Sequence, residues 1–133
     1  MYGGGGYGVD ATNTELSGLE YLGGSSCQTY NAITLNKGEA ISVVIGTYGD
    51  RRTGKSATGT QFGSYSVAAG GNATSTSGGV GSGNKGTTLQ ETRATSANAK
   101  NPNNGRFGDV YGYGSGRSII TGAGAVYLKY LGD

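Results

Sequence analysis

The stretch GGGGYG at residues 3–8 decides the fold, and two longer glycine-rich stretches repeat its character further along the chain. They read AAGGNATSTSGGVGSGNKG at 68–86 and GYGSGRSIITGAG at 112–124, and the three stretches together hold 17 of the 29 glycines, which are therefore bunched. Glycine runs by themselves are typical of flexible linkers or disordered tracts. Here short apolar segments with the alternation of β-strands lie between the runs. This interleaving predicts a folded domain in which bare backbone packs against bare backbone.

Glycine runs can fold because a residue without Cβ can adopt an extended helix of three residues per turn whose neighbours approach closely. Such helices make no internal hydrogen bonds, so they must bond to one another across a stack. Ordering glycine costs more conformational entropy than ordering any other residue, and the stack therefore needs support. The sequence predicts an all-β chain with glycine-rich irregular structure, in which short β-hairpins support packed, extended polyglycine-type helices.

The apolar segments predict where the supporting strands lie. Residues 29–48 read TYNAITLNKGEAISVVIGTY and predict a hairpin, with apolar alternation on both sides of the turn-like NKGE at 36–39. QFGSYSVAA at 61–69 and AVYLKYL at 125–131 predict two further strands. Residues 70–106 are mainly Gly, Ser, Thr and Asn, and they are expected either to be disordered or to form glycine-based extended structure.

Length and composition limit the possible functions. The 133 residues are expected to form a single glycine-rich domain, 1–133, and its net charge of +2 is too small to indicate a nucleic-acid or anionic membrane partner. Histidine, the commonest general base and metal ligand, is absent. The single Cys27 is expected to be a small, partly buried apolar side chain. No apolar run is long enough to insert in a membrane as a helix.

Two phosphate-binding patterns occur, and neither has the context that its chemistry needs. GDRRTGKS at 49–56 matches a P-loop, but the segment after it has the composition of a β-strand instead of the required helix. GSGNKG at 81–86 matches the dinucleotide-binding pattern, yet it neither follows a strand nor opens a helix. The eight carboxylates lie beside no clear aromatic cluster. We therefore predict no catalytic residue, no metal site, no cofactor and no enzymatic activity.

The ten tyrosines are the most suggestive side chains, because each combines an apolar ring with a polar tip. Several of them sit beside glycines, where the backbone can turn sharply and present a ring to a partner. Stacking on rings and bidentate hydrogen bonds from arginine would then hold a receptor. The predicted receptor-binding residues are Tyr48, Arg51, Arg52, Tyr111 and Tyr113. By contrast, Tyr127 or Tyr130 is expected to belong to the packed core.

The order of these features resembles the glycine-rich domains at the tips of bacteriophage tail fibres and related adhesins. The resemblance is carried by the first glycine run, ITLNKGEAISVVIG, TQFGSYSVAAGG with the glycine tract behind it, GYGSG, and GAGAVYLKYL. In that family, glycine helices pack in a bundle and the loops between them contact the host surface. The family usually has a strand ahead of the first glycine run, which here is missing or supplied from elsewhere, and residues 87–106 contain less glycine than the family pattern.

The resemblance implies a non-enzymatic structural protein of a phage tail fibre or tail tip that binds a host cell-surface receptor, either a glycan or a surface protein. Its implied partners are other virion tail proteins and further copies of itself, with a trimer favoured. Its implied location is the virion tail or an extracellular surface. Similar glycine-rich domains also occur in bacterial surface proteins, so the alternative is a bacterial extracellular structural or filament-forming protein.

Overall fold

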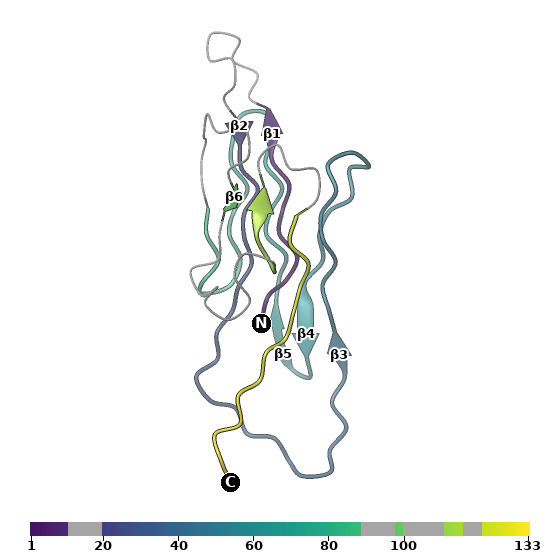
Figure 1. The fold of residues 1–133 in the computed structure, drawn as a ribbon, viewed down its shortest axis with the longest axis vertical. Helices are drawn as coiled ribbons and strands as arrows, with labels where there is room; N and C mark the ends of the chain where they lie inside the picture. The colour runs from purple at the N-terminus through teal and green to yellow at the C-terminus, as the bar shows by residue number, and fades with distance from the viewer. Residues whose placement is uncertain (11–19, 89–97, 100–110, 116–120) are drawn as a thin grey trace.

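The computed structural model describes residues 1–10, 20–88, 98–99, 111–115 and 121–133, and these contain short strands and no helix (Figure 1). The strands are β1 (Val9–Asp10), β2 (Glu20–Tyr21), β3 (Val43–Val44), β4 (Thr60–Phe62), β5 (Tyr65–Val67), β6 (Asn98–Ala99) and β7 (Gly114–Ser115). They form a three-stranded antiparallel sheet in the order β3-β4-β5 and two antiparallel pairs, β1-β2 and β6-β7. This agrees with the mostly β and irregular fold predicted from the sequence.

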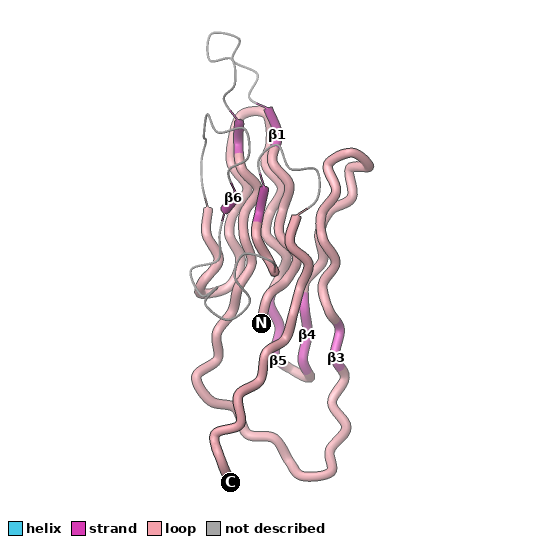
Figure 2. The backbone as a smooth tube through the Cα atoms, in the orientation of Figure 1, coloured by secondary structure: helices cyan, strands magenta, loops and turns pink. Residues whose placement is uncertain are grey.

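Most of the described backbone lies outside these strands, yet it runs in extended segments side by side along the long axis of the molecule (Figure 2). The C-terminus lies at one end of that axis, and the N-terminus lies partway along it (Figure 1). We call the C-terminal end the base; it consists of residues 28–45, 60–67 and 126–133. The bunched glycines lie above the base, in the half that we call the glycine body.

The first glycine run lies in the middle of the glycine body. Residues 3–6 are all buried, and the amides of Gly4, Gly5 and Gly6 donate hydrogen bonds of 2.9 Å to carbonyl oxygens of three different segments. The three acceptors are Thr58, Gly122 and Gly24, in that order. A β-strand has neighbours only in the plane of its sheet. This run instead has hydrogen-bonded neighbours on several sides.

Hydrogen-bonded partners along adjacent segments recur at every third residue. The Gly70 amide donates to the Gly4 carbonyl, and the Ala73 amide donates to the Tyr7 carbonyl, both at 2.9 Å. The same spacing relates two further pairs of segments: Gly79 to Leu22 with Ser82 to Ser25, and Gly124 to Gly46 with Thr121 to Gly49. Side chains of a β-strand alternate with a period of two. The glycine body therefore follows a different geometric repeat from that of the three-stranded sheet.

The segments approach so closely that a side chain would not fit between them. A Cβ on Gly5 would overlap the carbonyl oxygen of Tyr113. One on Gly6 would overlap the carbonyl oxygen of Gly71. Since the obstacle is backbone and not the end of a flexible side chain, neither clash can be relieved without moving a segment. Packing, more than backbone dihedral freedom, thus requires glycine at these positions.

Buried hydroxyl groups complete the bonding where a backbone partner is lacking. The Thr121 hydroxyl is buried, accepts a hydrogen bond of 2.7 Å from the Gly49 amide and donates one of 2.5 Å to the Gly5 carbonyl. The Ser26 hydroxyl likewise accepts from the Gly3 amide at 3.0 Å and donates to the Ala68 carbonyl at 2.6 Å. A small side chain with one donor and two lone pairs can bridge two backbones in this way.

The apolar core is small. Its buried members among the described residues are Tyr2, Leu22, Cys27, Phe62, Val67 and Ala73. Cys27 is 1% exposed, and burial raises the pKa of its thiol, so this side chain, predicted to be partly buried, is buried almost completely. Backbone hydrogen bonds therefore hold much of the described structure in place of a large hydrophobic core.

The three-stranded sheet differs from the prediction at residues 61–69, which form a hairpin and not one strand. β4 and β5 pair across Gly63 and Ser64, and Gly63 has a φ of 57°. Glycine with positive φ at the first position of a two-residue loop is typical of a type II′ turn, whose twist matches that of paired strands. Thr60, Phe62 and Val67 point into the core from this hairpin.

The predicted hairpin at 29–48 is wrong in its pairing. The turn at 36–39 is present, because the Glu39 amide donates to the Asn36 carbonyl at 3.2 Å, and Gly38 has a φ of 82°. However, β3 pairs with β4 across Val43 and Phe62, and residues 29–35 form no strand. The backbone of β3 therefore finds its partner later in the chain, while the side chains of Val43 and Val44 remain exposed.

The predicted strand at 125–131 and the predicted core tyrosines are also wrong. Only Ala125 forms a β-bridge, with Tyr2, and no residue after it lies in a strand. Tyr127 is 39% exposed and Tyr130 is 76% exposed. Of the stretch 70–106, residues 70–88 form extended pieces joined by a bend at 75–77 and a turn at 83–85, and they are hydrogen-bonded to neighbouring segments; most of the remainder lies outside the described residues.

Replacing Gly5 by alanine should destabilise the fold strongly, because its Cβ would meet the Tyr113 carbonyl in a buried position. We expect a loss of about 3 kcal/mol or more in the free energy of unfolding, at the upper end of overpacking effects. Gly38→Ala is the matched control: its Cβ meets nothing within 4 Å, so only the positive φ should cost about 1–2 kcal/mol. Chemical denaturation of both variants measures the difference, and equal losses would contradict the close packing.

Candidate binding site

The basic loop, residues 48–56, is a tight turn that projects from the glycine body (Figure 1). Asp50 and Lys55 close it with two backbone hydrogen bonds, of 2.8 Å from the Asp50 amide and 3.0 Å from the Lys55 amide. Between them the Gly54 amide donates to the Arg51 carbonyl at 3.3 Å, and Gly54 has a φ of 68°. The loop therefore has a defined shape despite its polar composition.

The glycine body holds both ends of the basic loop. Before the loop, the Gly49 amide donates to the buried hydroxyl of Thr121. After the loop, the carbonyl of Thr58 accepts from the Gly4 amide at 2.9 Å, and the Thr58 hydroxyl accepts from the Thr47 amide at 2.8 Å. Because these anchors reach the central glycine run, the position of the loop is fixed by the body.

The charges of the basic loop are only partly neutralised within it. Arg52 donates to Asp50 from its backbone amide at 2.9 Å and from its guanidinium at 3.3 and 3.4 Å. This hydrogen bonding holds the pKa of Asp50 below its ordinary value, and the positive charge of the guanidinium lowers it by a smaller amount. The Lys55 ammonium lies 4.9 Å from the centroid of the Tyr48 ring, within cation–π range. Three cations and one carboxylate give the loop a charge of +2.

The predicted receptor-binding residues fall into two groups. Tyr48, Arg51 and Arg52 share the basic loop, where Tyr48 is 38% exposed. Tyr111 and Tyr113 belong to the glycine body, and both are half-buried. The Tyr111 ring lies 6.3 Å from that of the buried Tyr2, and the Tyr113 carbonyl accepts a hydrogen bond from a body amide. Lys55, which the sequence prediction omitted, joins the first group through its contact with the Tyr48 ring.

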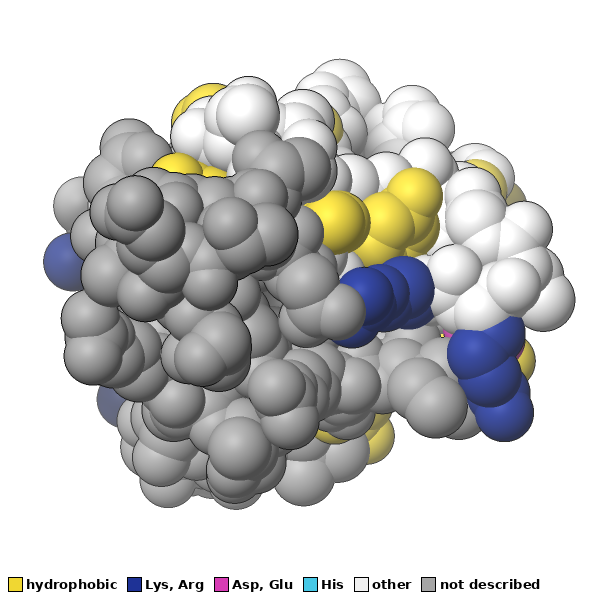
Figure 3. Space-filling model, turned by 90° about the horizontal axis from the view of Figure 1, so that it is seen from above, with side chains coloured by type: hydrophobic (Ala, Val, Ile, Leu, Met, Phe, Trp, Pro, Cys, Tyr) yellow, Lys and Arg dark blue, Asp and Glu magenta, His cyan; other side chains and the backbone are white. Residues whose placement is uncertain are grey.

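Viewed from the end opposite the C-terminus, lysine and arginine side chains stand at the surface beside apolar side chains (Figure 3). Within the described residues, no group of three or more His, Cys, Asp or Glu side chains could hold a metal ion. A search of the same residues finds no helix long and apolar enough to cross a membrane.

Neither glycine pattern has the structure of a nucleotide site. In the basic loop, Ser56 is followed by extended backbone and then β4, so no helix N-terminus faces the P-loop glycines. The GSGNKG pattern at 81–86 wraps around Cys27, whose carbonyl accepts from the Lys85 amide at 3.0 Å. Its Gly83 adopts a φ of 77°. Both patterns form turns that are held by backbone hydrogen bonds.

A second concave surface lies in the base, and sequence reasoning missed it. A cavity of about 1020 Å³, which we call the base groove, separates residues 28–35 from residues 127–133. Phe62 and Tyr65 of the β4-β5 hairpin line it as well. The signal was present in the alternating apolar residues at 29–35 and 125–131, but these were interpreted as two segments that pack within the domain.

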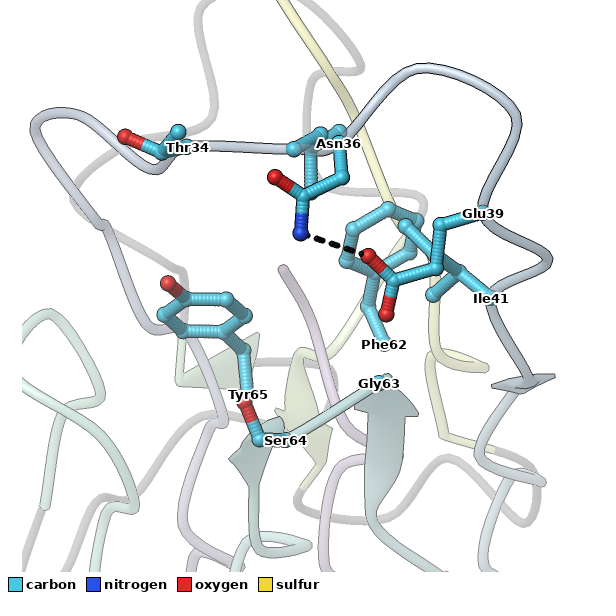
Figure 4. Close-up of a pocket in the computed structure, with 9 residues that line it drawn as sticks. Thr34, Asn36, Glu39, Ile41, Phe62, Gly63, Ser64 and Tyr65 are labelled. Atoms are coloured by element: carbon cyan, nitrogen blue, oxygen red, sulfur yellow. Dashed lines mark hydrogen bonds between the residues drawn. The ribbon is translucent and has the colours of Figure 1, made fainter.

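A smaller cavity of about 200 Å³ adjoins the base groove at the turn 36–39. Phe62 and Tyr65 line it together with Ile41, and the Asn36 amide group donates to the Glu39 carboxylate at 3.0 Å across its mouth (Figure 4). Side chains thus leave cavities in the base beside the apolar segments that the sequence predicted to be packed.

Comparison of the chain with protein-family models, with curated protein sequences and with solved structures finds no match.

The basic loop should not bind ATP or GTP in the presence of magnesium. The phosphates would find neither a helix N-terminus nor the acceptors of a magnesium site, because Asp50 is held by Arg52. Isothermal titration calorimetry of the chain and of Lys55→Ala should show no heat of binding in either case. Micromolar binding by the wild-type chain that Lys55→Ala abolishes would contradict this interpretation.

The carboxyl group of Asp50 should titrate below the ordinary pKa of an aspartate. Arg52 stabilises the ionised form, so the ion pair stabilises the loop at neutral pH and is lost as the pH falls through the lowered pKa. NMR titration should show this pKa rising towards the ordinary value in Arg52→Ala. Arg51→Ala, which removes the neighbouring charge, should leave it nearly unchanged; equal shifts in the two variants would exclude the specific pair.

Proposed function

We propose that this chain is a non-enzymatic structural protein of a phage tail fibre or tail tip that binds a receptor on the host cell surface. The observation that carries the proposal is a charged, ring-bearing loop fixed at both ends to a body held by backbone hydrogen bonds. Binding without chemistry needs a surface of fixed shape that presents groups able to form hydrogen bonds. The order of the glycine runs and apolar segments, which resembles tail-tip adhesins, supports the same proposal.

We also propose that the glycine segments are extended polyglycine-type helices. Three residues per turn would bring every third amide to the same neighbouring segment. The recurrence of partners at every third residue, as from Gly70 and Ala73 to Gly4 and Tyr7, supports this geometry. In such a bundle each segment is surrounded by others, and the polar loops at its ends are the parts that can vary.

The chemistry of the basic loop favours an anionic receptor. Arginine presents a planar fork of donors that matches carboxylate and phosphate groups, and lysine adds a second positive charge. The exposed part of the Tyr48 ring offers a stacking surface for a sugar ring or an apolar side chain. We therefore place the receptor contacts on Tyr48, Arg51, Arg52 and Lys55. Tyr111 and Tyr113 have a smaller part in this proposal, because they are half-buried in the body.

The proposal includes association with other tail proteins and with further copies of the chain, at the virion tail or an extracellular surface. The exposed apolar side chains of the base support an additional partner there, since isolated soluble domains rarely expose large contiguous apolar patches. The alternative, a filament-forming bacterial surface protein, would also use the base for assembly. Electron microscopy of the purified chain separates the two, because only the alternative predicts long fibres.

Loss of the loop cations should weaken binding to host cells by at least about tenfold, since one hydrogen bond to a charged group contributes about 1.5–3 kcal/mol. The test variant is Arg51→Ala with Lys55→Ala. The matched control, Lys37→Ala with Lys85→Ala, removes two exposed positive charges outside the basic loop instead. Binding of the fluorescently labelled chain to a panel of bacterial strains, with and without enzymatic removal of surface glycans, measures the effect. Equal losses in both variants would show non-specific charge attraction, and undiminished binding by the test variant would exclude the basic loop.

A further inference from the structure

The base groove is bounded by two extended segments whose backbones have no hydrogen-bonded partner. The rim segment, residues 31–35, and the tail, residues 128–132, make no backbone hydrogen bond to any part of the chain that the structure describes. Nevertheless the groove between them is lined by apolar side chains. Unpaired donors and acceptors beside an apolar surface form a template for an additional β-strand.

The tail itself has the character of a strand that lacks a sheet. Leu128 is 53% exposed and Leu131 is 66% exposed, and with Tyr127 and Tyr130 they place apolar groups on both faces of the segment. Lys129 is the one charged residue between these four apolar side chains, so the segment is mainly but not wholly apolar. Here its side chains contribute to the wall of the groove and remain open to solvent.

The exposed apolar side chains around the groove supply most of the area of a stable interface. The side chains that line it and stand exposed are Tyr30, Leu35, Tyr127, Leu128, Tyr130 and Leu131. Taking roughly 150–250 Å² for a large side chain, their exposed fractions amount to about 600 Å² per copy. The uncovered backbone of the two segments adds to this area, and a stable protein interface buries about 800 Å² per partner.

We propose that the base groove is the interface for a second copy of this chain, which inserts its tail as a β-strand between the rim segment and the tail of the first copy. An extended segment with apolar side chains would pair with the backbone of the groove and cover its apolar side chains, and the tail is such a segment. The pairing is self-complementary, so one two-fold axis would satisfy both copies. The inference goes beyond the proposed receptor binding, which uses the opposite end of the molecule.

The two edges of each tail limit the assembly to two copies. In the pair, one tail bonds along one edge to the partner's tail and along its other edge to the partner's rim segment. A strand has no third edge, so a third tail has no place to bond. The resemblance to tail-fibre tips by itself favours a trimer, whereas the geometry of the base points to a dimer.

Sedimentation equilibrium of the purified chain tests the proposal. One copy has a mass of 13.3 kDa, and we expect twice that mass at rising concentration. Leu128→Lys with Leu131→Lys should abolish the dimer, because lysine at these positions cannot be buried. Both side chains are exposed in the single chain, so the glycine body should keep its melting temperature. Val80→Lys is the matched control, since Val80 is a 69% exposed aliphatic residue outside the base groove, and it should remain dimeric.

Two further measurements identify the contact surface. Leu131→Cys should form disulfide-linked dimers under mild oxidation while Val80→Cys does not, and the buried Cys27 is common to both. Amides 128–132 should be protected from hydrogen exchange in the wild-type chain and unprotected in the double lysine variant. A single-copy or three-copy mass, or a dimer that survives the double lysine variant, would overturn the proposal. None of these outcomes depends on receptor binding, so the dimer and the receptor-binding loop are tested independently.

Discussion

Backbone in direct contact with backbone is the constraint on which the rest of this structure depends. The carbonyl oxygen of one segment occupies the space that a Cβ on the next segment would need, as between Tyr113 and Gly5 or between Gly24 and Gly70. Every such contact brings amides within reach of carbonyls on several sides. The entropy lost in ordering so many glycines is offset by dense hydrogen bonding and not by side-chain burial. This explains how a domain with few buried apolar side chains can hold long extended segments in register.

The same constraint separates the molecule into parts with different tasks. Inside the glycine body there is room only for small groups, so polar adjustment comes from hydroxyls such as those of Ser26 and Thr121. Large side chains are displaced to the basic loop and to the base. A ring with a cation above it therefore occurs at one place, and exposed leucines and tyrosines gather at another. The large exposed side chains therefore lie apart from the backbone contacts that hold the glycine body together.

Sequence reasoning succeeded where the pattern was local. The glycine run at 3–8 indicated close backbone packing, and the composition after Ser56 indicated a strand, where the structure has extended backbone and then β4. It failed where a strand had to choose a partner: nothing in residues 29–48 indicates that β3 bonds to β4 in preference to the segment before its turn. Gly63 and Ser64 form a turn that divides one predicted strand into the β4-β5 hairpin. Glycine can adopt a positive φ at any position, so its presence in the sequence does not show where a turn forms.

The candidate site shows the same division. Tyr48, Arg51 and Arg52 are close in sequence and lie on one loop, whereas no local signal distinguishes the half-buried Tyr111 from an exposed ring. Its contact with Tyr2 joins residues from opposite ends of the chain. The base groove was missed for a related reason. Apolar alternation predicts that a face will be covered, but it carries no information on whether the cover comes from the same molecule.

The three-residue recurrence of partners also restricts how the length of such a chain can change. Adding one residue within the segment that begins at Gly3 would shift every later residue out of this three-residue spacing and present each amide to a different neighbour. Adding three residues would restore the spacing and lengthen the segment. In the basic loop no such rule applies, because its residues bond mainly to one another. Insertions and deletions in related chains should therefore come in multiples of three inside the glycine body and in any number at the loops. The outer surface can then vary while the interior keeps its three-residue spacing of hydrogen-bond partners.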